Sequence, residues 1–305
     1  MSLVSFFLLL VMVMISVAFF TLMERKILGY IHVRKGPNKV GFVGVFQPFS
    51  DVVSLFLSEV NFMKMMNLFI YMLVPFFSLI LMLLFWLVFN WYYSVIEMEY
   101  GLVFFLCISS LGVYVIFLGG WSSNSKYALL GSFRGLAQII SYEVSLAMLL
   151  MGLVFFSGSY GLMDVSLFQE SYWVIWGFFS LSVVWLISLL AETSRSPFDL
   201  SEGESELVSG FNTEYGSYGF AMLFMSEYGN IIYMSMLTSH LLLGGQGVVC
   251  MNLLMVMYIF LLVRGTLVRF RYDKLMMVAW SGILPFSILM MLILFMLKLY
   301  FFSMF

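Results

Sequence analysis

Three carboxylates stand in or beside apolar stretches of this sequence, where a charge is costly. Glu143 lies about two turns into one stretch, Glu227 lies near the middle of another, and Glu192 closes a third. An ionised carboxylate at the centre of a bilayer costs at least about 2.5–3.5 kcal/mol, so such groups face the interior of a helix bundle or bind a proton. Because several occur together, we interpret them as sites of proton or charge transfer. The alternative is a set of buried carboxyls held by structural hydrogen bonds.

A strongly acidic segment, residues 191–217, follows the stretch that Glu192 closes. It contains one cation, Arg195, among several carboxylates. Like charges that lie close together raise one another's pKa, so some of these carboxylates should stay protonated. Leu200 and Phe211 are among the apolar residues that should hold the segment against the bundle, although a solvated acidic loop is the ordinary alternative. The carboxylates of this segment beyond Glu192 are Asp199, Glu202, Glu204, Glu206 and Glu214.

The composition places these groups in a membrane protein. Of 305 residues, 63% are hydrophobic and 10% are charged, and the mean hydropathy is +1.06. A soluble domain is about 45–50% apolar and about 25% charged. The net charge is −2 and the sequence has no basic tail, which argues against a nucleic-acid-binding protein. Two cysteines, Cys107 and Cys250, both in apolar stretches, indicate neither a disulfide framework nor a metal cluster.

Eight apolar stretches are long enough to cross a bilayer as helices, for which about 20 residues are needed. We therefore predict an all-α integral membrane protein, with residues 1–305 forming one polytopic domain. Pro75 and Pro285 should each disturb a helix. A polar stripe predicts an interfacial amphipathic helix at 47–59. The predicted spans are roughly 3–23, 65–90, 102–121, 136–155, 172–190, 218–237, 244–263 and 275–302.

The basic residues predict the orientation of these spans. With eight spans, thirteen of the fourteen Lys and Arg residues fall in loops on one side, and only Lys298 lies elsewhere. This asymmetry follows the positive-inside rule and places both termini on the opposite side.

Signatures of a bound redox group are missing from the sequence. His32 lies in a loop and His240 stands alone in its span, so no histidine pair is placed for haem. The sequence also has no Cys-x-x-Cys, Rossmann or P-loop fingerprint. We therefore expect no metal site, no catalytic residue of its own and no cofactor in this chain. A partner would supply any electron carrier.

Several strings resemble one family, chain 1 of NADH–ubiquinone oxidoreductase, respiratory complex I. They run in matching order from the first span to about Lys274. The strings are Glu24–Tyr30, Arg34–Asn38, Gln47–Asp51, Ser141–Glu143, Ala191–Leu200 and Glu202–Asn212.

The resemblance implies a membrane subunit that forms much of the chamber through which ubiquinone, the substrate, enters from the bilayer. It assigns the chamber side to Arg25, Arg34, Asp51, Phe224 and Arg271. It assigns the acidic path from quinone to the proton-pumping subunits to Glu143, Glu192, Asp199, Glu202, Glu204, Glu206, Glu214 and Glu227, with Arg195 as their cationic neighbour.

The same resemblance implies partners and a compartment. NADH, FMN and iron–sulfur clusters would belong to other complex I subunits, with hydrophilic quinone-reducing subunits on the matrix side. Small and antiporter-like membrane subunits and lipids would surround the chain. With 26 Met and 34 Phe, the chain resembles a mitochondrially encoded animal protein of the inner membrane, with charged loops to the matrix and termini toward the intermembrane space. The alternatives are an energy-converting hydrogenase subunit, a stand-alone proton-coupled transporter and a purely structural anchor.

Overall fold

The regular elements of the protein are helical throughout the part described by this computed structural model, which covers residues 2–61, 64–89, 98–169, 173–201, 203, 210–244 and 249–304. This confirms the all-α fold class. The longer helices are α1 (Ser2–Ile31), α2 (Gln47–Leu57), α3 (Leu68–Phe85), α4 (Gly101–Ser123), α5 (Lys126–Ser157), α8 (Phe179–Glu192), α10 (Ser217–Leu242), α11 (Val249–Thr266) and α13 (Leu284–Met304). The short elements are η1 (Phe42–Gly44), η2 (Trp86–Val88), α6 (Leu162–Phe168), α7 (Val174–Gly177), η3 (Gly210–Asn212), α12 (Tyr272–Met277) and η4 (Val278–Ile283).

Six helices of the described residues are long and apolar enough to cross a membrane. They are Val4–Ile31, Leu68–Val88, Gly101–Ser123, Lys126–Ser157, Val249–Thr266 and Tyr272–Tyr300. The two other expected spans fall on α7 with α8, and on α10. Phe178 separates α7 from the 14-residue α8 with a non-helical backbone, and α10 is long but less apolar. The count of eight crossings therefore stays a prediction.

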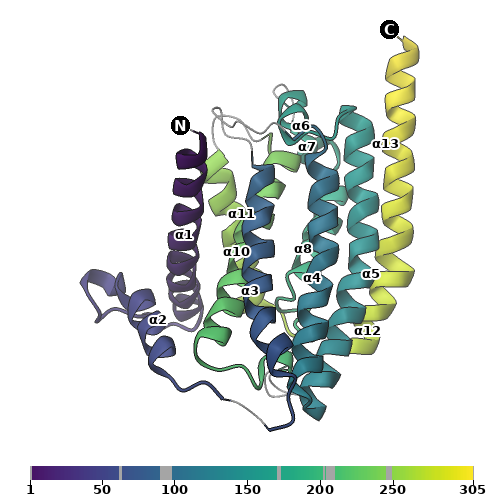
Figure 1. Ribbon diagram of the computed structural model, residues 1–305. Coiled ribbons are helices and arrows are strands. Elements are labelled where there is room, and N and C mark those ends of the chain that lie inside the picture. The colour runs from purple at the N-terminus through teal and green to yellow at the C-terminus, as the bar shows by residue number, and fades with distance from the viewer. Residues whose placement is uncertain are drawn as a thin grey trace.

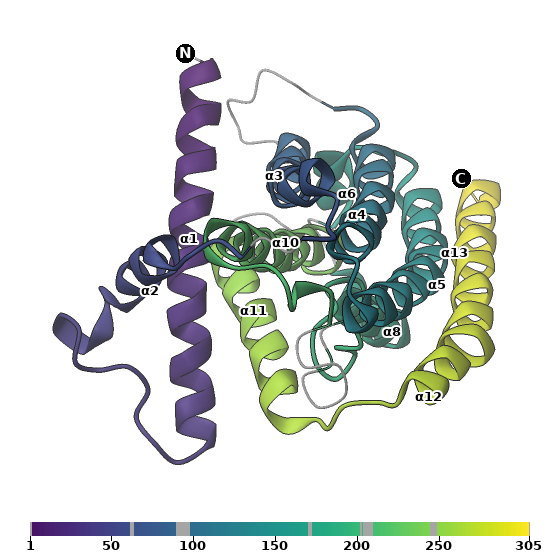
Figure 2. The same cartoon turned by 60° about the horizontal axis from the view of Figure 1, so that its bottom comes forward.

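Helix α10 occupies the centre of the bundle. It packs against α3 on one side and against α1 and α11 on the other, and α2 touches its lower part. Figure 2 shows it enclosed by these helices. Every residue from 231 to 242 is buried, including Ser235, Thr238 and Ser239, whose hydroxyls donate to carbonyls of their own helix. Its polar face is thus shielded from lipid.

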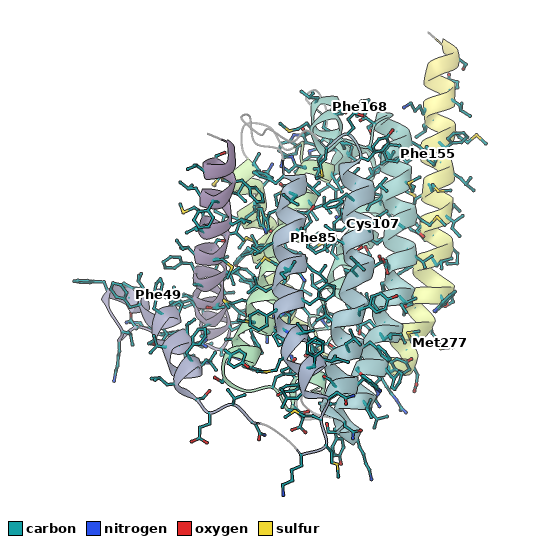
Figure 3. The ribbon with its side chains drawn as sticks, viewed as in Figure 1. Phe49, Phe85, Cys107, Phe155, Phe168 and Met277 are labelled. Carbon is teal, nitrogen blue, oxygen red and sulfur yellow. The ribbon has the colours of Figure 1, made fainter. Side chains whose placement is uncertain are left out.

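The two chain ends lie at the same end of the bundle (Figure 1). Figure 3 places Phe168 near that end, and it places Met277, of α12, near the opposite one. The amphipathic α2 projects sideways near this opposite end. Phe49 on α2 makes an edge contact with Phe19 of α1, with ring centroids 6.2 Å apart, while nearly half of its surface stays exposed. An exposed apolar face on a short helix beside the bundle is suited to the bilayer interface.

The two prolines expected to disturb helices have different surroundings. Pro75 lies inside α3, which continues through it. Pro285 is the second residue of α13, directly after η4, a π-helical segment that joins α12 to α13. Proline has no N–H to donate and its ring crowds the preceding turn, so a widened turn before it accommodates both effects.

Candidate functional site

A cavity of about 100 Å³ lies at the heart of the bundle, between α3, α4, α10 and the chain that follows α8. Two of the predicted carboxylates, Glu192 and Glu227, line it from different elements. Glu143 of α5 does not line the cavity, but it lies close enough to Ser109, which does, and to Glu192 for its carboxylate to interact with both. Two carboxylates from separate elements thus line one space, and a third lies nearby.

The rest of the cavity wall combines apolar side chains with hydroxyl and amide groups. Four of its buried polar atoms have no hydrogen-bond partner among the described residues: Glu192 Oε2, Ser194 Oγ, Ser201 Oγ and Asn230 Oδ1. Buried polar atoms are normally paired with protein or with ordered water. A space of this size, with several polar partners, satisfies the requirements for holding more than one water molecule.

The cation of the acidic segment, Arg195, is buried beside the cavity. Its Nη2 lies 3.3 Å from Oε2 of Glu227, and its guanidinium lies over the ring of Tyr228, 4.5 Å from the centroid. An arginine can use both contacts because its planar charge stacks on an aromatic face while its edge donates hydrogen bonds. The structure therefore brings Arg195 and Glu227 together.

A second buried ion pair extends this arrangement toward α1. Arg264 at the end of α11 pairs with Glu24 of α1, whose side chain is buried. Tyr228 lies near this pair, since its ring contacts Phe20, one turn before Glu24 on α1, with centroids 5.7 Å apart. Charged side chains and the neutral Tyr228 therefore lead from Arg264 and Glu24 to Arg195 and the cavity, and they connect the helix that carries Arg25 with the one that carries Glu227.

The acidic segment is held against α5 at the described parts of its length. The amide of Gln138 donates to the carbonyls of Ala191 (2.8 Å) and Phe198 (2.7 Å), so one buried side chain fixes both sides of the turn. One and two turns earlier on α5, Gly135 and Gly131 lie against Ser201 and Gly210 of the segment. A Cβ on Gly131 would come within 2.9 Å of Gly210 Cα, which leaves no room for a side chain.

The remaining described acids of the segment lie at its two ends. Asp199 pairs with Arg269 at 3.1 Å, beside the stacked rings of Phe198 and Phe270. At the other end, the hydroxyl of Tyr71 donates to the backbone carbonyl of Glu214.

The ring of Tyr71 also stacks on Tyr215, with centroids 4.3 Å apart. Burial raises the pKa of Tyr215 to about 12, so its hydroxyl keeps its proton at neutral pH. Glu202, Glu204 and Glu206 lie outside the described residues.

Of the five residues assigned to the chamber side, the structure brings together two. Arg25 of α1 pairs with Asp51 of α2, and the amide of Gln47 donates to the same carboxylate at 2.8 Å. Phe224 lies on the α10 face that meets α1, where it packs on Phe220 with centroids 4.3 Å apart.

The other two chamber residues make no ion pair with Arg25 or Asp51 in the described part of the chain. Arg34 is exposed in the loop after α1. Arg271 is exposed before α12 and pairs with its neighbour Asp273 at 3.1 Å. No group of three or more potential metal ligands occurs among the described residues.

Four residues of this network were not predicted as site residues: Glu24, Arg264, Gln138 and Ser109. Glu24 stands in a charged string at the end of a span, where a lipid-headgroup contact is the ordinary expectation. Its burial depends on Arg264, 240 positions away, and no pattern in a single sequence signals that pairing. Gln138 had one usable signal, since it is an amide within an apolar stretch.

Comparison with known proteins identifies the class of this bundle. A family described as NADH dehydrogenase matches residues 4–295. The chain is 51% identical over 290 residues to NADH-ubiquinone oxidoreductase chain 1 of Aedes aegypti, covering 94% of this chain and 93% of that protein. It is 52% identical over 291 residues to the protein of that name in Locusta migratoria, with the same coverage, and 45% identical over 287 residues to that of Balaenoptera physalus, with 90% of each chain covered.

The chain therefore belongs to the family of NADH–ubiquinone oxidoreductase chain 1, whose members are membrane subunits of respiratory complex I. Its mitochondrial relatives and apolar helices make it a multi-pass protein of the mitochondrial inner membrane. Its partners are the other complex I subunits.

Proposed function

We propose that this subunit couples quinone reduction to proton translocation through the carboxylates around the central cavity. The observation that carries this proposal is that Glu192 and Glu227, from separate elements, line one cavity that also contains hydroxyl and amide groups, and that Glu143 lies close enough to interact with Glu192. Water in such a cavity would connect the carboxylates by hydrogen bonds. A charge that changes at one of them then acts on the others across a short, poorly screened distance.

We place the quinone chamber on the side of the bundle formed by α1, α2 and α10. This placement is supported by the Arg25–Asp51 pair, which joins the first two helices, and by Phe224 on α10. The exposed apolar face of α2 would lie at the bilayer surface, where a lipid-soluble substrate arrives. Electrons would come from NADH through FMN and iron–sulfur clusters in hydrophilic subunits on the matrix side, where the charged loops would lie.

The chain of charges from Arg264 to Glu227 supports a route between these two regions. Reduction of a quinone near Arg25 would change the electric field at Glu24, the preceding residue of α1. Glu24 and Arg195 both lie near Tyr228, and Arg195 pairs with Glu227 at the cavity. A small shift of Arg195 between Glu227 and Tyr228 would pass that change to the cavity without any electron carrier in this chain.

Glu192→Gln in the assembled complex tests the coupling role. Complex I would be reconstituted into sealed vesicles, and NADH-driven quinone reduction and proton pumping would be measured in the same sample. We expect pumping to fall at least tenfold while quinone reduction in the presence of an uncoupler keeps most of its rate. Glu99→Gln, at an exposed carboxylate before α4, is the matched control and should change neither rate.

If both rates fall together in Glu192→Gln, the residue shapes the chamber rather than the coupling path. If neither falls, the cavity has no role in coupling. Quinone location is tested separately by photoaffinity labelling with a quinone-like reagent in native membranes. Label on residues 25–59 or around Phe224, removed by excess quinone, supports the chamber at α1, α2 and α10, whereas competed label elsewhere contradicts it.

A further inference from the structure

A second cavity of the bundle has a chemistry opposite to that of the first. It is a groove of about 370 Å³ between α8 and α11, closed at its loop end by the turn after α8 and by α12. All thirteen residues that line it are apolar, including Leu186 and Leu190 of α8 and Val263 of α11. Figure 2 shows that α8 and α11 stand apart at this side of the bundle, since α11 packs on α10 and α1 whereas α8 packs on α5.

We propose that this groove binds one acyl chain of a phospholipid with an anionic headgroup. The occupant must be apolar, because a ligand with a polar ring inside the groove would find no hydrogen-bond partner among these side chains. Several lining residues, such as Ile259 and Phe270, also expose much of their surface. In a bilayer these surfaces are in contact with hydrocarbon.

The length of the groove favours a lipid over a helix of another subunit. On α8 it extends from Val183 to Leu190, and along α11 from Ile259 to Leu267, the residue just after the helix ends, which is about 10–12 Å at 1.5 Å per residue. One leaflet contributes about half of the roughly 30 Å hydrocarbon thickness. The groove therefore reaches from the loop level to about the middle of the bilayer. A partner helix would need a surface along the whole thickness.

The charges at the loop end favour an anionic headgroup. Phe270 and Leu275 close that end, and the chain between them carries Arg271 and Lys274. Lys274 is exposed and makes no ion pair with a described residue, and the pair of Arg271 with Asp273 is exposed to solvent, where a headgroup phosphate can compete for it. Cations at this depth attract anionic lipids. Basic side chains therefore stand where the headgroup of a lipid in the groove would lie.

The test uses intact complex I reconstituted into vesicles that contain phosphatidylglycerol with a diazirine near the end of one acyl chain. After illumination, the labelled peptides of this chain are mapped by mass spectrometry. We expect label on residues 183–190 and 259–267 to exceed label on the lipid-facing side of α13 at least threefold. The same diazirine on phosphatidylcholine should give less label, and raising the salt concentration should reduce the preference for phosphatidylglycerol.

Two variants make the test specific. Leu186→Trp fills the groove and should remove the excess label, whereas Leu289→Trp, at an exposed position on α13, should not. Lys274→Gln should lower the preference for phosphatidylglycerol while the groove stays intact.

Equal labelling of the groove and α13 would overturn the proposal, since it would show ordinary bulk lipid. A crosslink from the groove to another subunit, with no lipid label, would also overturn it and would assign the groove to a partner helix. Competition of the label by excess quinone would assign it to the substrate's tail instead.

Discussion

Two kinds of ion pair in this subunit have the same chemistry and opposite surroundings. The pair of Arg195 with Glu227 lies in the core, with side-chain exposures of 9% and 23%. The pair of Arg25 with Asp51 lies at the rim, with exposures of 51% and 33%. Exposed ion pairs contribute little to the stability of the fold, because water solvates each partner when the other is absent. Removing one partner of a buried pair instead leaves a charge that nothing solvates. The core network should therefore determine whether the bundle holds together, and the rim pair should matter for what binds there.

The largest effect is expected from Arg195→Met. It leaves Glu227 without its cation and removes the stacking on Tyr228, so we expect a loss of about 3–5 kcal/mol of stability. The measurement is the thermal transition of the purified complex, together with the amount of this chain in it. Arg195→Lys, which keeps a charge but not the planar contact, should lose less. If both variants assemble and melt like the native complex, the core pair does not carry stability.

A smaller effect is expected from Glu24→Gln. The amide keeps the size of the side chain, but it removes the charge that Arg264 faces. Because a third of the Arg264 side chain is exposed, water can take over part of the solvation, and we expect a loss of about 1.5–3 kcal/mol. The double variant with Arg264→Gln should regain part of it, since no unpaired charge remains. Strictly additive losses would show that Glu24 and Arg264 do not interact.

The smallest effect on stability is expected from Asp51→Asn at the rim. Its pair with Arg25 is exposed, so the loss should be about 0.2–1 kcal/mol. If α1 and α2 enclose the quinone chamber, the KM for a short-chain quinone should rise severalfold while the melting temperature changes little. Ser54→Ala, one turn further along α2, is the control and should alter neither quantity. A large drop in melting temperature with an unchanged KM would reverse the distinction between core and rim.

The sequence alone predicts which side chains are unusual better than it predicts where they meet. Hydropathy and helix length are local properties, so the all-α membrane class and the carboxylates in apolar surroundings follow directly from residues such as Glu143 and Glu227. The interruption at Phe178 was not predicted, because the single glycine before it, Gly177, lies in an otherwise continuous apolar stretch, and one glycine does not by itself end a helix.

Contacts between distant elements could not be predicted at all. Arg195 lies 32 positions from Glu227, and Glu24 lies 240 positions from Arg264. A hydropathy pattern states how deep a residue lies in the bilayer but not which helix stands beside it. The cavity likewise depends on the side-by-side placement of α3, α4 and α10, and the resemblance to a family supplied the roles of residues but not their geometry.

The central position of α10 has a consequence for how the subunit is made. Its relatively polar, fully buried segment from 231 to 242 lies between α3 and α1, both of which are synthesised long before it. At about 5–20 residues per second, synthesis takes on the order of tens of seconds to reach residue 242. Until then the earlier helices lack the central helix against which they pack, and the polar segment of α10 is unfavourable in lipid unless those helices surround it. Biogenesis of this protein should therefore depend on a partner that binds the incomplete bundle in the membrane until α10 has been synthesised.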